Sequence, residues 1–225
     1  PYTTLFRSDF IFKWAKPVDK LLTLGSSLSE YFKEVGILEE KISTGFHYVD
    51  SDYYHKNTEL KNHEPITIIA MGALQRDYLM LAEIVKTCTA VHWIICRGRK
   101  DVDYLFPKTD NVELKGFLLE DELYHQMDIA DISLNIMEDT VGSNVITTSM
   151  AMGLAIVATD VGSIRDYCDE SNAVFCQNSV KSIVEAINSI IWDEEKIYKM
   201  KKSSIRKSLE LSIDRVDGWF KSLSY

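Results

Sequence analysis

Four consecutive residues, Val141-Gly142-Ser143-Asn144, combine a glycine with two residue types that commonly begin helices. A helix that begins at Ser143 or Asn144 directs unpaired backbone N–H groups and the positive end of its dipole toward this turn. Such a helix start is suited to an anion, for example a phosphate. The sequence therefore predicts that Gly142, Ser143 and Asn144 bind a phosphate through their backbone amides.

The elements that position this turn follow it directly. Residues 145–152 are expected to form a short helix with small side chains, and Gly153 is the glycine that commonly ends a helix. Residues 154–158, LAIVA, are uniformly apolar, which is typical of a strand buried on both faces. Residues 160–163 then turn the chain at the carboxyl end of that strand. Open α/β sheets bind their ligands at this edge.

Strand and helix patterns alternate through most of the chain, which predicts an α/β fold with a doubly wound parallel sheet covered on both faces. A short strand at 19–24, a helix at 26–35 and an extended run at 41–50 come first. The expected strands of the sheet are 65–71, 92–96, 111–114, 130–136, 154–158 and 172–176. The expected helices are 76–88, 120–127, 145–152, 180–192, 196–207 and 212–223.

Composition narrows the class of protein. The 225-residue chain is 46% hydrophobic and carries a formal net charge of -9, so a general nucleic-acid-binding surface, which needs a basic face, is not expected. No apolar run reaches the length of a membrane span. The four cysteines show no metal-binding spacing, and we expect them to be reduced, buried thiols. They are Cys88, Cys96, Cys168 and Cys176.

Residues 150–162, MAMGLAIVATDVG, resemble the segment EAMACGLPVVATDVGG of the group 1 glycosyltransferases, which have the GT-B fold. The match is long and ungapped. It implies that residues 65–211 form the Rossmann-like, nucleotide-sugar-binding C-terminal half of a GT-B enzyme. An unrelated doubly wound domain that shares this βα turn is the alternative.

The resemblance also divides the rest of the chain. Residues 9–50 resemble the end of the N-terminal acceptor domain and the start of the linker, residues 51–64 are the polar linker, and residues 212–225 form a C-terminal helix. Residues 1–8, PYTTLFRS, read as the translation of a common sequencing adaptor. We therefore expect the native sequence to begin near Asp9, with most of its N-terminal domain missing.

The activity implied by the resemblance is transfer of a sugar from a nucleotide-diphosphate sugar to a hydroxyl acceptor, with retention of configuration, in polysaccharide or glycoconjugate biosynthesis. The partners implied are the nucleotide sugar and a glycan or lipid-linked acceptor, with no nucleic acid, no metal and no cofactor besides the donor substrate. A cytoplasmic location is expected, with peripheral association at the inner face of the membrane, through the missing domain, as an open option. The fragment alone is expected to be inactive.

Two positions depart from the family at its paired glutamates. The alignment places these glutamates, which lie near the sugar and the ribose in the family, at Thr140 and Thr148. Threonine can hydrogen-bond a hydroxyl group but cannot act as a charged acceptor. Glu138 and Asp139 lie beside the first position and could supply a carboxylate.

The cations that face the diphosphate in the family are also displaced. The family arginine after the first glycine corresponds to Ala73, which follows Gly72, and Arg76 is the nearest cation. Arg76 could reach the phosphates or be a solvated residue at a helix start. The cluster that begins at Arg97, RGRK, follows the second strand and could face a nucleotide or be solvated.

Gly116 and Phe117 match the family's Gly-Phe after the third strand, in a region that lies beside the nucleotide base. We assign both to the donor site, although Phe117 is more readily explained as a core residue than as a stacking one. Asp131 is expected to fix a turn, and residues 199–202 to form a solvated helix face.

Asp160, Ser163 and Asp166 follow the strand at 154–158, and the first two have two interpretations. Asp160 and Ser163 could bond a sugar or stabilise their turn through side-chain-to-backbone hydrogen bonds. Asp166 occupies the place of the family's glutamate after glycine-isoleucine-proline.

Two other functions remain open. A degenerate, non-catalytic GT-B protein that binds a sugar nucleotide or a partner would explain the lost glutamates and arginine. A GT-B nucleotide-sugar 2-epimerase is the other, although the acidic and histidine groups that it needs across the cleft are not located in this sequence.

Overall fold

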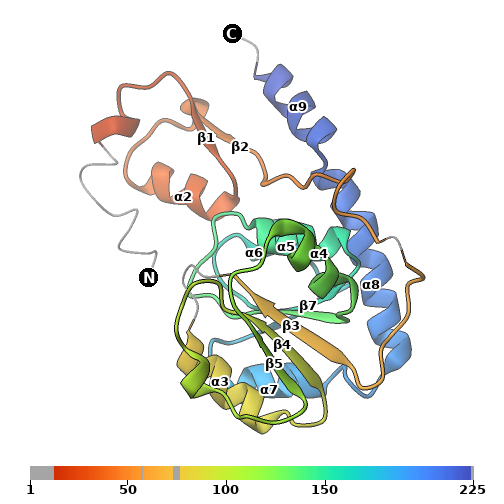
Figure 1. Ribbon diagram of the computed structural model, residues 1–225. Helices are drawn as coiled ribbons and strands as arrows, with labels where there is room; N and C mark the ends of the chain where they lie inside the picture. The colour runs from red at the N-terminus through yellow and green to blue at the C-terminus, as the bar shows by residue number, and fades with distance from the viewer. Residues whose placement is uncertain (1–12, 57, 73–76, 224–225) are drawn as a thin grey trace.

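A computed structural model describes residues 13–56, 58–72 and 77–223. It confirms the predicted α/β architecture, a parallel sheet of six strands in the order β5-β4-β3-β6-β7-β8 with helices on both faces (Figure 1). This is the doubly wound order. From β3 the chain adds strands toward one edge of the sheet, and from β6 it adds them toward the other edge. The strands are β3 (Thr67–Met71), β4 (His92–Cys96), β5 (Val112–Lys115), β6 (Ile132–Asn135), β7 (Ala155–Thr159) and β8 (Ala173–Cys176).

Helices cover the two faces in separate groups (Figure 1). On one face lie α3 (Tyr78–Thr87) and α7 (Val180–Asn188), which contact each other. On the other lie α4 (Glu120–Asp128), α5 (Asn144–Ala151) and the long α8 (Glu194–Ser208), which packs on α5 and β7. The short α6 (Ile164–Tyr167) follows β7, and α9 (Ile213–Ser222) ends the chain after the short 3-10 turn η3 (Leu209–Leu211). A further 3-10 turn, η2 (Asp103–Leu105), lies between β4 and β5.

A small N-terminal lobe stands beside the carboxyl ends of the main sheet's strands (Figure 1). It comprises the parallel pair β1 (Leu21–Thr23) and β2 (Ile42–Thr44), α2 (Ser26–Glu34) and η1 (Glu39–Lys41). Its own core is small, with Phe32 and Ile37 buried against partly buried neighbours. The lobe therefore depends on contacts with the larger domain, and these contacts involve residues of the candidate site.

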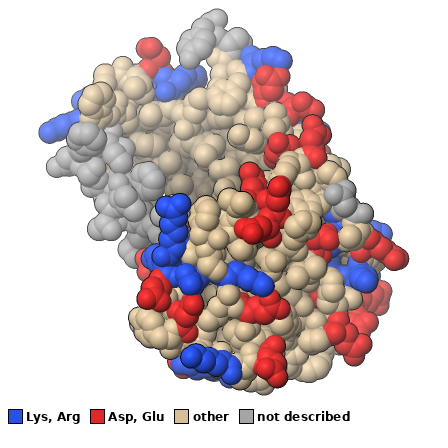
Figure 2. Space-filling view, viewed as in Figure 1, with Lys and Arg blue, Asp and Glu red and all other residues tan. Residues whose placement is uncertain are grey.

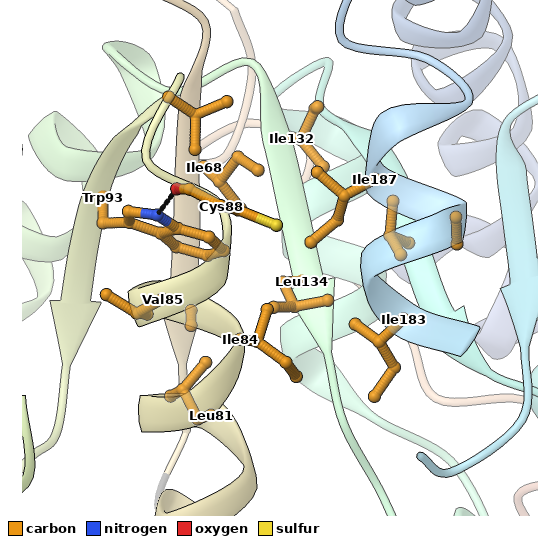
Figure 3. Packing of buried hydrophobic residues seen from close by; sticks show 14 of the residues in the cluster. Ile68, Leu81, Ile84, Val85, Cys88, Trp93, Ile132, Leu134, Ile183 and Ile187 are labelled. Atoms are coloured by element: carbon orange, nitrogen blue, oxygen red, sulfur yellow. Dashed lines mark hydrogen bonds between the residues drawn. The ribbon is translucent and has the colours of Figure 1, made fainter. Parts of the chain in front are cut away.

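The main core lies between the sheet and the α3–α7 layer (Figure 3). Ile84 of α3 and Ile187 of α7 pack toward Ile68 and Ile132 of the two central strands, and all four are fully buried. Trp93 of β4 is also fully buried, and its indole N–H donates to the Cys88 carbonyl at 2.9 Å. This hydrogen bond satisfies the polar atom of the largest side chain in the core.

Local sequence signals set most element boundaries as predicted. Gly36 and Gly153 follow their helices with φ of 89° and 70°, a conformation that glycine adopts without a side-chain penalty. The helix expected from residue 76 begins at Tyr78, because the Asp77 side chain accepts a hydrogen bond from Met80 N at 2.9 Å and caps it. The helix expected at 180–192 ends at Asn188. The turn after β7 continues into α6, a helix that was not predicted.

The prediction that residues 199–202 form a solvated helix face is wrong for Lys201. Lys201 lies with its side chain fully buried on α8, where its ammonium contacts Asp131 Oδ1 at 2.8 Å and donates to the Lys61 carbonyl. Asp131 does more than fix a turn, because it also accepts from Thr67 N at 2.9 Å and from His63 N. The pair therefore ties residues 61–63, β3 and α8 together. Burial lowers the pKa of Lys201, and the Asp131 carboxylate opposes that shift.

The four cysteines are buried free thiols, as expected. Removal from water raises the pKa of Cys96 and Cys168 to about 12 and that of Cys176 to about 11, because burial penalises the thiolate. Burial likewise raises the pKa of Cys88.

We expect these thiols to resist a disulfide reagent such as DTNB at pH 8 while the chain is folded, because the thiolate is the reactive form. All four should react within the mixing time in 6 M guanidinium. The measurement is the absorbance of released thionitrobenzoate with time. Rapid release of one or more equivalents by the folded chain would contradict this expectation.

Among the described residues, no helix combines the length and the apolar character needed to cross a membrane.

Candidate nucleotide-binding site

The carboxyl ends of β3, β4 and β5 enclose a hollow of about 120 Å³. Glycines follow all three strands here, Gly72, Gly98 and Gly116, and their missing side chains leave room for a ligand near the backbone. Phe117, Leu118 and Leu123 form the outer wall. The hollow lies next to the point where the strand order reverses, which is where doubly wound sheets bind nucleotides.

Phe117 lies at the rim of this hollow, with 59% of its surface exposed. The expectation that it belongs to the core is therefore wrong. The Arg99 guanidinium carbon lies 4.8 Å from the ring centroid, a cation–π arrangement. An exposed ring held at the mouth of a hollow can stack against a planar base.

Arg97 lies beside the hollow, but its guanidinium forms hydrogen bonds within the loop that follows β4. Its guanidinium pairs with Asp103 through Nε and through Nη2, the latter at 3.1 Å from Oδ2, and its Nη1 donates to the Lys100 carbonyl at 2.7 Å. These contacts give Arg97 a role in shaping the loop that carries Arg99. Arg76 lies outside the described residues.

Basic side chains gather on one part of the surface (Figure 2). Figure 2 shows several Lys and Arg side chains close together in the left half of the larger domain, with some acidic side chains beside them, and more acidic side chains toward the right flank. The overall charge of -9 is thus unevenly distributed over the face shown. A local basic group can attract an anionic ligand to an acidic protein.

The loop after β6 carries the residues aligned with the first family glutamate. Glu138 is exposed, whereas the Asp139 carboxylate accepts from Thr140 N at 2.8 Å. Thr140 is buried, and its carbonyl accepts from Ser163 N at 2.7 Å. Of the two neighbouring carboxylates, Glu138 is therefore the one left directed to solvent.

The predicted anion site lies at the start of α5. Ser143 occupies the N-cap position, but its side chain forms no capping hydrogen bond. Among the described residues, no acceptor is bonded to the amides of Asn144 and Val145. Thr148 directs its hydroxyl back to the Asn144 carbonyl at 2.6 Å, so it faces its own helix. The helix start thus keeps free donors for an anion.

Gly142 lets this loop pass close to the N-terminal lobe. Its φ is 143°, and a Cβ atom there would lie 2.9 Å from Leu24 Cβ and 3.0 Å from Tyr167 Oη. A larger residue would therefore push the loop away from both. The requirement for glycine was predicted, but its cause, a contact with a segment more than a hundred residues earlier, was not.

The two parts of the site meet at the end of β3. Gly72 lines the hollow, and it also lines a smaller cavity of about 20 Å³ that reaches Ile136 at the end of β6. Ile136 lies two residues before Glu138. The structure therefore brings Gly72, Gly116 and Phe117 to the same sheet edge as the loop of residues 138–144.

Sequence reasoning missed the contact between this loop and the N-terminal lobe. Ser26 and Ser27, at the start of α2, hydrogen-bond Asp166 and Ser163, at α6. The turn at 160–163 is the one feature of the sequence that draws attention to this region. It does not indicate the partners, because they lie 136–140 residues away in the chain. His47 also takes part in this contact, because it donates its backbone N–H to Tyr167 Oη at 2.8 Å.

Within the described ranges, no group of three or more His, Cys, Asp or Glu side chains is arranged to hold a metal ion.

The sequence family described as "Glycosyl transferases group 1" matches residues 66–193 of this chain. No sequence of a curated protein matches it. Among solved structures, sucrose-phosphate synthase from Thermosynechococcus elongatus is similar with a TM-score of 0.83 and 11% identity, over 99% of this chain and 63% of that one. A glycosyltransferase from Rickettsia africae ESF-5 is similar with a TM-score of 0.81 and 12% identity, over 96% of this chain and 66% of that one.

The structure of HepE from Anabaena in complex with UDP-glucose is similar with a TM-score of 0.78 and 13% identity, over 95% of this chain and 66% of that one. At these identities the likeness shows a shared fold. The chain spans 63–66% of the length of these three proteins.

Proposed function

This chain belongs to the group 1 glycosyltransferases, and we propose that it holds the donor site of an enzyme that transfers a sugar from a nucleotide-diphosphate sugar to a hydroxyl acceptor. Its six-stranded sheet is the Rossmann-like half of the GT-B fold. The proposal extends the family assignment to a particular ligand and to particular residues.

The observation that carries the proposal is the pairing of two features at one sheet edge. The hollow beside Phe117 can take a flat base, and the free amides at the start of α5 can take a phosphate. A nucleotide diphosphate has both groups joined through a ribose. HepE, which shares the fold, is a protein solved with UDP-glucose, and this supports a nucleotide sugar as the ligand.

In the proposed reaction the bond between the sugar's C1 and the diphosphate oxygen breaks, and a new bond forms from C1 to the acceptor oxygen. The acceptor hydroxyl gives up its proton, which the departing diphosphate takes up. Catalysis then depends on positioning the two substrates and stabilising the departing diphosphate. The α5 amides and the Arg99 guanidinium would stabilise that charge, with Glu138 as the solvent-directed carboxylate close to the first family glutamate position.

The wider assignments follow from the same proposal. We expect a glycan or lipid-linked acceptor, retention of configuration, no metal and no cofactor beyond the donor substrate. We also expect a cytoplasmic protein, with peripheral association at the inner face of the membrane as the alternative. The acceptor site would be shared with a further domain, so the 225-residue chain is expected to bind the donor without turning it over.

A second candidate function is binding of a sugar nucleotide without catalysis. Thr140 and Thr148 favour it, because neither can provide a charged group and Thr148 is bonded to its own helix. Turnover by the longer protein would exclude it. Binding without turnover in the longer protein would support it.

We expect one nucleotide among UDP, GDP and ADP, or its sugar conjugate, to raise the melting temperature of the 225-residue chain by several degrees. A ligand at a hundred times its Kd adds about 2.7 kcal/mol to the free energy of unfolding. For a chain of this size each kcal/mol corresponds to about 2–4 °C. The measurement is a thermal melt with each ligand. A folded chain that shows no shift with any of them would contradict the proposed donor site.

The variant Phe117→Ala tests whether the nucleotide that raises the melting temperature binds in the hollow. Loss of base stacking is expected to cost about 1–3 kcal/mol of binding, or about 5- to 150-fold in Kd. Phe220→Ala is the matched control, because Phe220 is similarly exposed but lies on α9. An equal loss of affinity in both variants would remove Phe117 from the site.

A further inference from the structure

The first turn of α2 is capped by a carboxylate from the other lobe. Asp166 of α6 accepts from Ser26 N at 2.5 Å and from Ser26 Oγ at 2.8 Å. An acidic group at a helix N-terminus is favoured by the free amides and by the helix dipole. The α2 helix has no side-chain cap of its own. Its N-terminus is therefore completed by residue 166 of the main domain.

The neighbouring residues of the two lobes form a second contact. Ser27 N donates to Ser163 Oγ at 3.0 Å, and the two hydroxyl oxygens lie 2.6 Å apart. Both residues are almost fully buried. Ser163 also donates its backbone N–H to the Thr140 carbonyl at 2.7 Å. A continuous chain of hydrogen bonds therefore runs from α2 through Ser163 to the loop after β6.

Close packing keeps this chain of contacts rigid. Tyr167 Oη donates to the Leu24 carbonyl and accepts from His47 N, so it holds two segments on the N-terminal side. Gly25 lies so close to Ser163 that a Cβ atom there would overlap the Ser163 hydroxyl. The contact thus leaves no room for a side chain at residue 25 between α2 and Ser163.

We propose that Ser163 and Asp166 are positioning residues that couple docking of the N-terminal lobe to the conformation of the loop at residues 138–144. Neither was assigned to the donor site, and neither needs to touch a donor. The inference rests on the proposed function for its ligand, but the coupling itself is a property of the chain. When α2 is docked, Ser163 holds the Thr140 carbonyl and fixes the loop that leads into α5.

The coupling is reciprocal for binding free energies. A nucleotide that orders the loop at 138–144 must also strengthen the docking of α2, and an undocked α2 must weaken nucleotide binding. A purely structural role for Asp166 would loosen α2 without changing the loop. Hydrogen exchange separates the two cases, because it measures each segment on its own.

The experiment compares amide hydrogen exchange in the wild-type chain, Asp166→Ala and Ser163→Ala, without nucleotide. Both variants are expected to exchange about tenfold faster or more in residues 24–34 and also in 137–145, with β3 and β4 unchanged. Ser163→Ala keeps the backbone bond to Thr140 and removes only the contact with Ser27, so it tests the coupling if Asp166→Ala fails to fold. Glu170→Gln is the control, since Glu170 is an exposed partner of Arg165 just beyond α6.

Faster exchange at 24–34 alone would overturn the proposal, because Asp166 and Ser163 would then stabilise α2 without reaching the loop. Equal acceleration in β3 and β4 would overturn it too, because it would report general destabilisation. Adding the nucleotide that shifts the melting temperature should slow residues 24–34 in the wild-type chain and leave Asp166→Ala unaffected. If the wild-type chain binds no nucleotide, the proposed function fails while the exchange without ligand still decides the coupling.

Discussion

The variant Asp131→Ala is expected to lower the free energy of unfolding by about 3–5 kcal/mol, the cost of leaving a buried charge without its partner. Asp131 and Lys201 both have fully buried side chains, and their charged atoms lie 2.8 Å apart. Removal of the carboxylate leaves the Lys201 ammonium without its counter-charge and Thr67 N without its acceptor. The measurement is urea unfolding of the 225-residue chain, followed by the fluorescence of its tryptophans.

The matched control for this variant lies on the same helix. Lys199 pairs with Glu195 at 2.6 Å, but both side chains are exposed, so Lys199→Ala should change the free energy of unfolding by no more than about 0.5 kcal/mol. A loss below about 1 kcal/mol in Asp131→Ala, or an equal loss in both variants, would show that the buried pair does not stabilise the fold.

The pH dependence of Asp131→Ala follows from the same pair. Burial already lowers the pKa of Lys201, and the variant removes the carboxylate that opposes this shift. The folded variant then binds fewer protons at Lys201 than the unfolded chain does, so its stability rises with pH. We expect the deficit relative to the wild-type chain to shrink between pH 7 and pH 10. A deficit that grows over this range would contradict the assignment to Lys201.

The variant Gly162→Ala is expected to be the most damaging single-methyl change at the site. Gly162 has a φ of 55°, and an added Cβ atom would overlap the backbone of Thr140 and the carboxylate of Asp139. The left-handed conformation costs a residue with a Cβ about 1–2 kcal/mol, and overpacking adds about 1–3 kcal/mol. The loop must move, so nucleotide affinity should also fall more than tenfold.

The control for Gly162→Ala is Gly36→Ala. Gly36 also has a positive φ, 89°, but nothing lies within 4 Å of where its Cβ would be. It should show the conformational cost alone, and its nucleotide affinity should be unchanged. Urea unfolding and nucleotide titration of both variants provide the comparison. Equal losses of stability and of affinity in the two variants would mean that the close approach of Gly162 to Thr140 contributes to neither.

Much of the fold could be predicted because its signals are local. Apolar runs between turn residues marked the six strands, and glycines such as Gly36 and Gly153 ended helices where their φ values require it. The alternation of strand and helix then indicated a parallel sheet, and strands of such a sheet end at one edge. That reasoning placed Gly72, Gly116 and the turn before α5, where a phosphate site is predicted, at one edge of the sheet.

The burial of individual side chains was harder to predict from the sequence. Lys201 lies in a lysine-rich run, which predicts a solvated position, yet it shares the buried face of α8 with Ile197, Met200 and Ser204. Their spacing at i, i+3, i+4 and i+7 is the signal that could have placed Lys201 inward. The sequence favours a core position for Phe117, and only the tertiary structure shows that its ring lies at the surface, at the rim of the hollow and beside Arg99.

The sequence by itself determined the fold class, the order of elements and the turn whose amides can bind a phosphate, because each depends on residues close together in the chain. The tertiary structure alone decided which distant residues meet. Asp131 and Lys201 are 70 residues apart, and Ser26 and Asp166 are 140 apart. No local pattern records such contacts, since they arise only when packing of the sheet and its helices brings separate segments together.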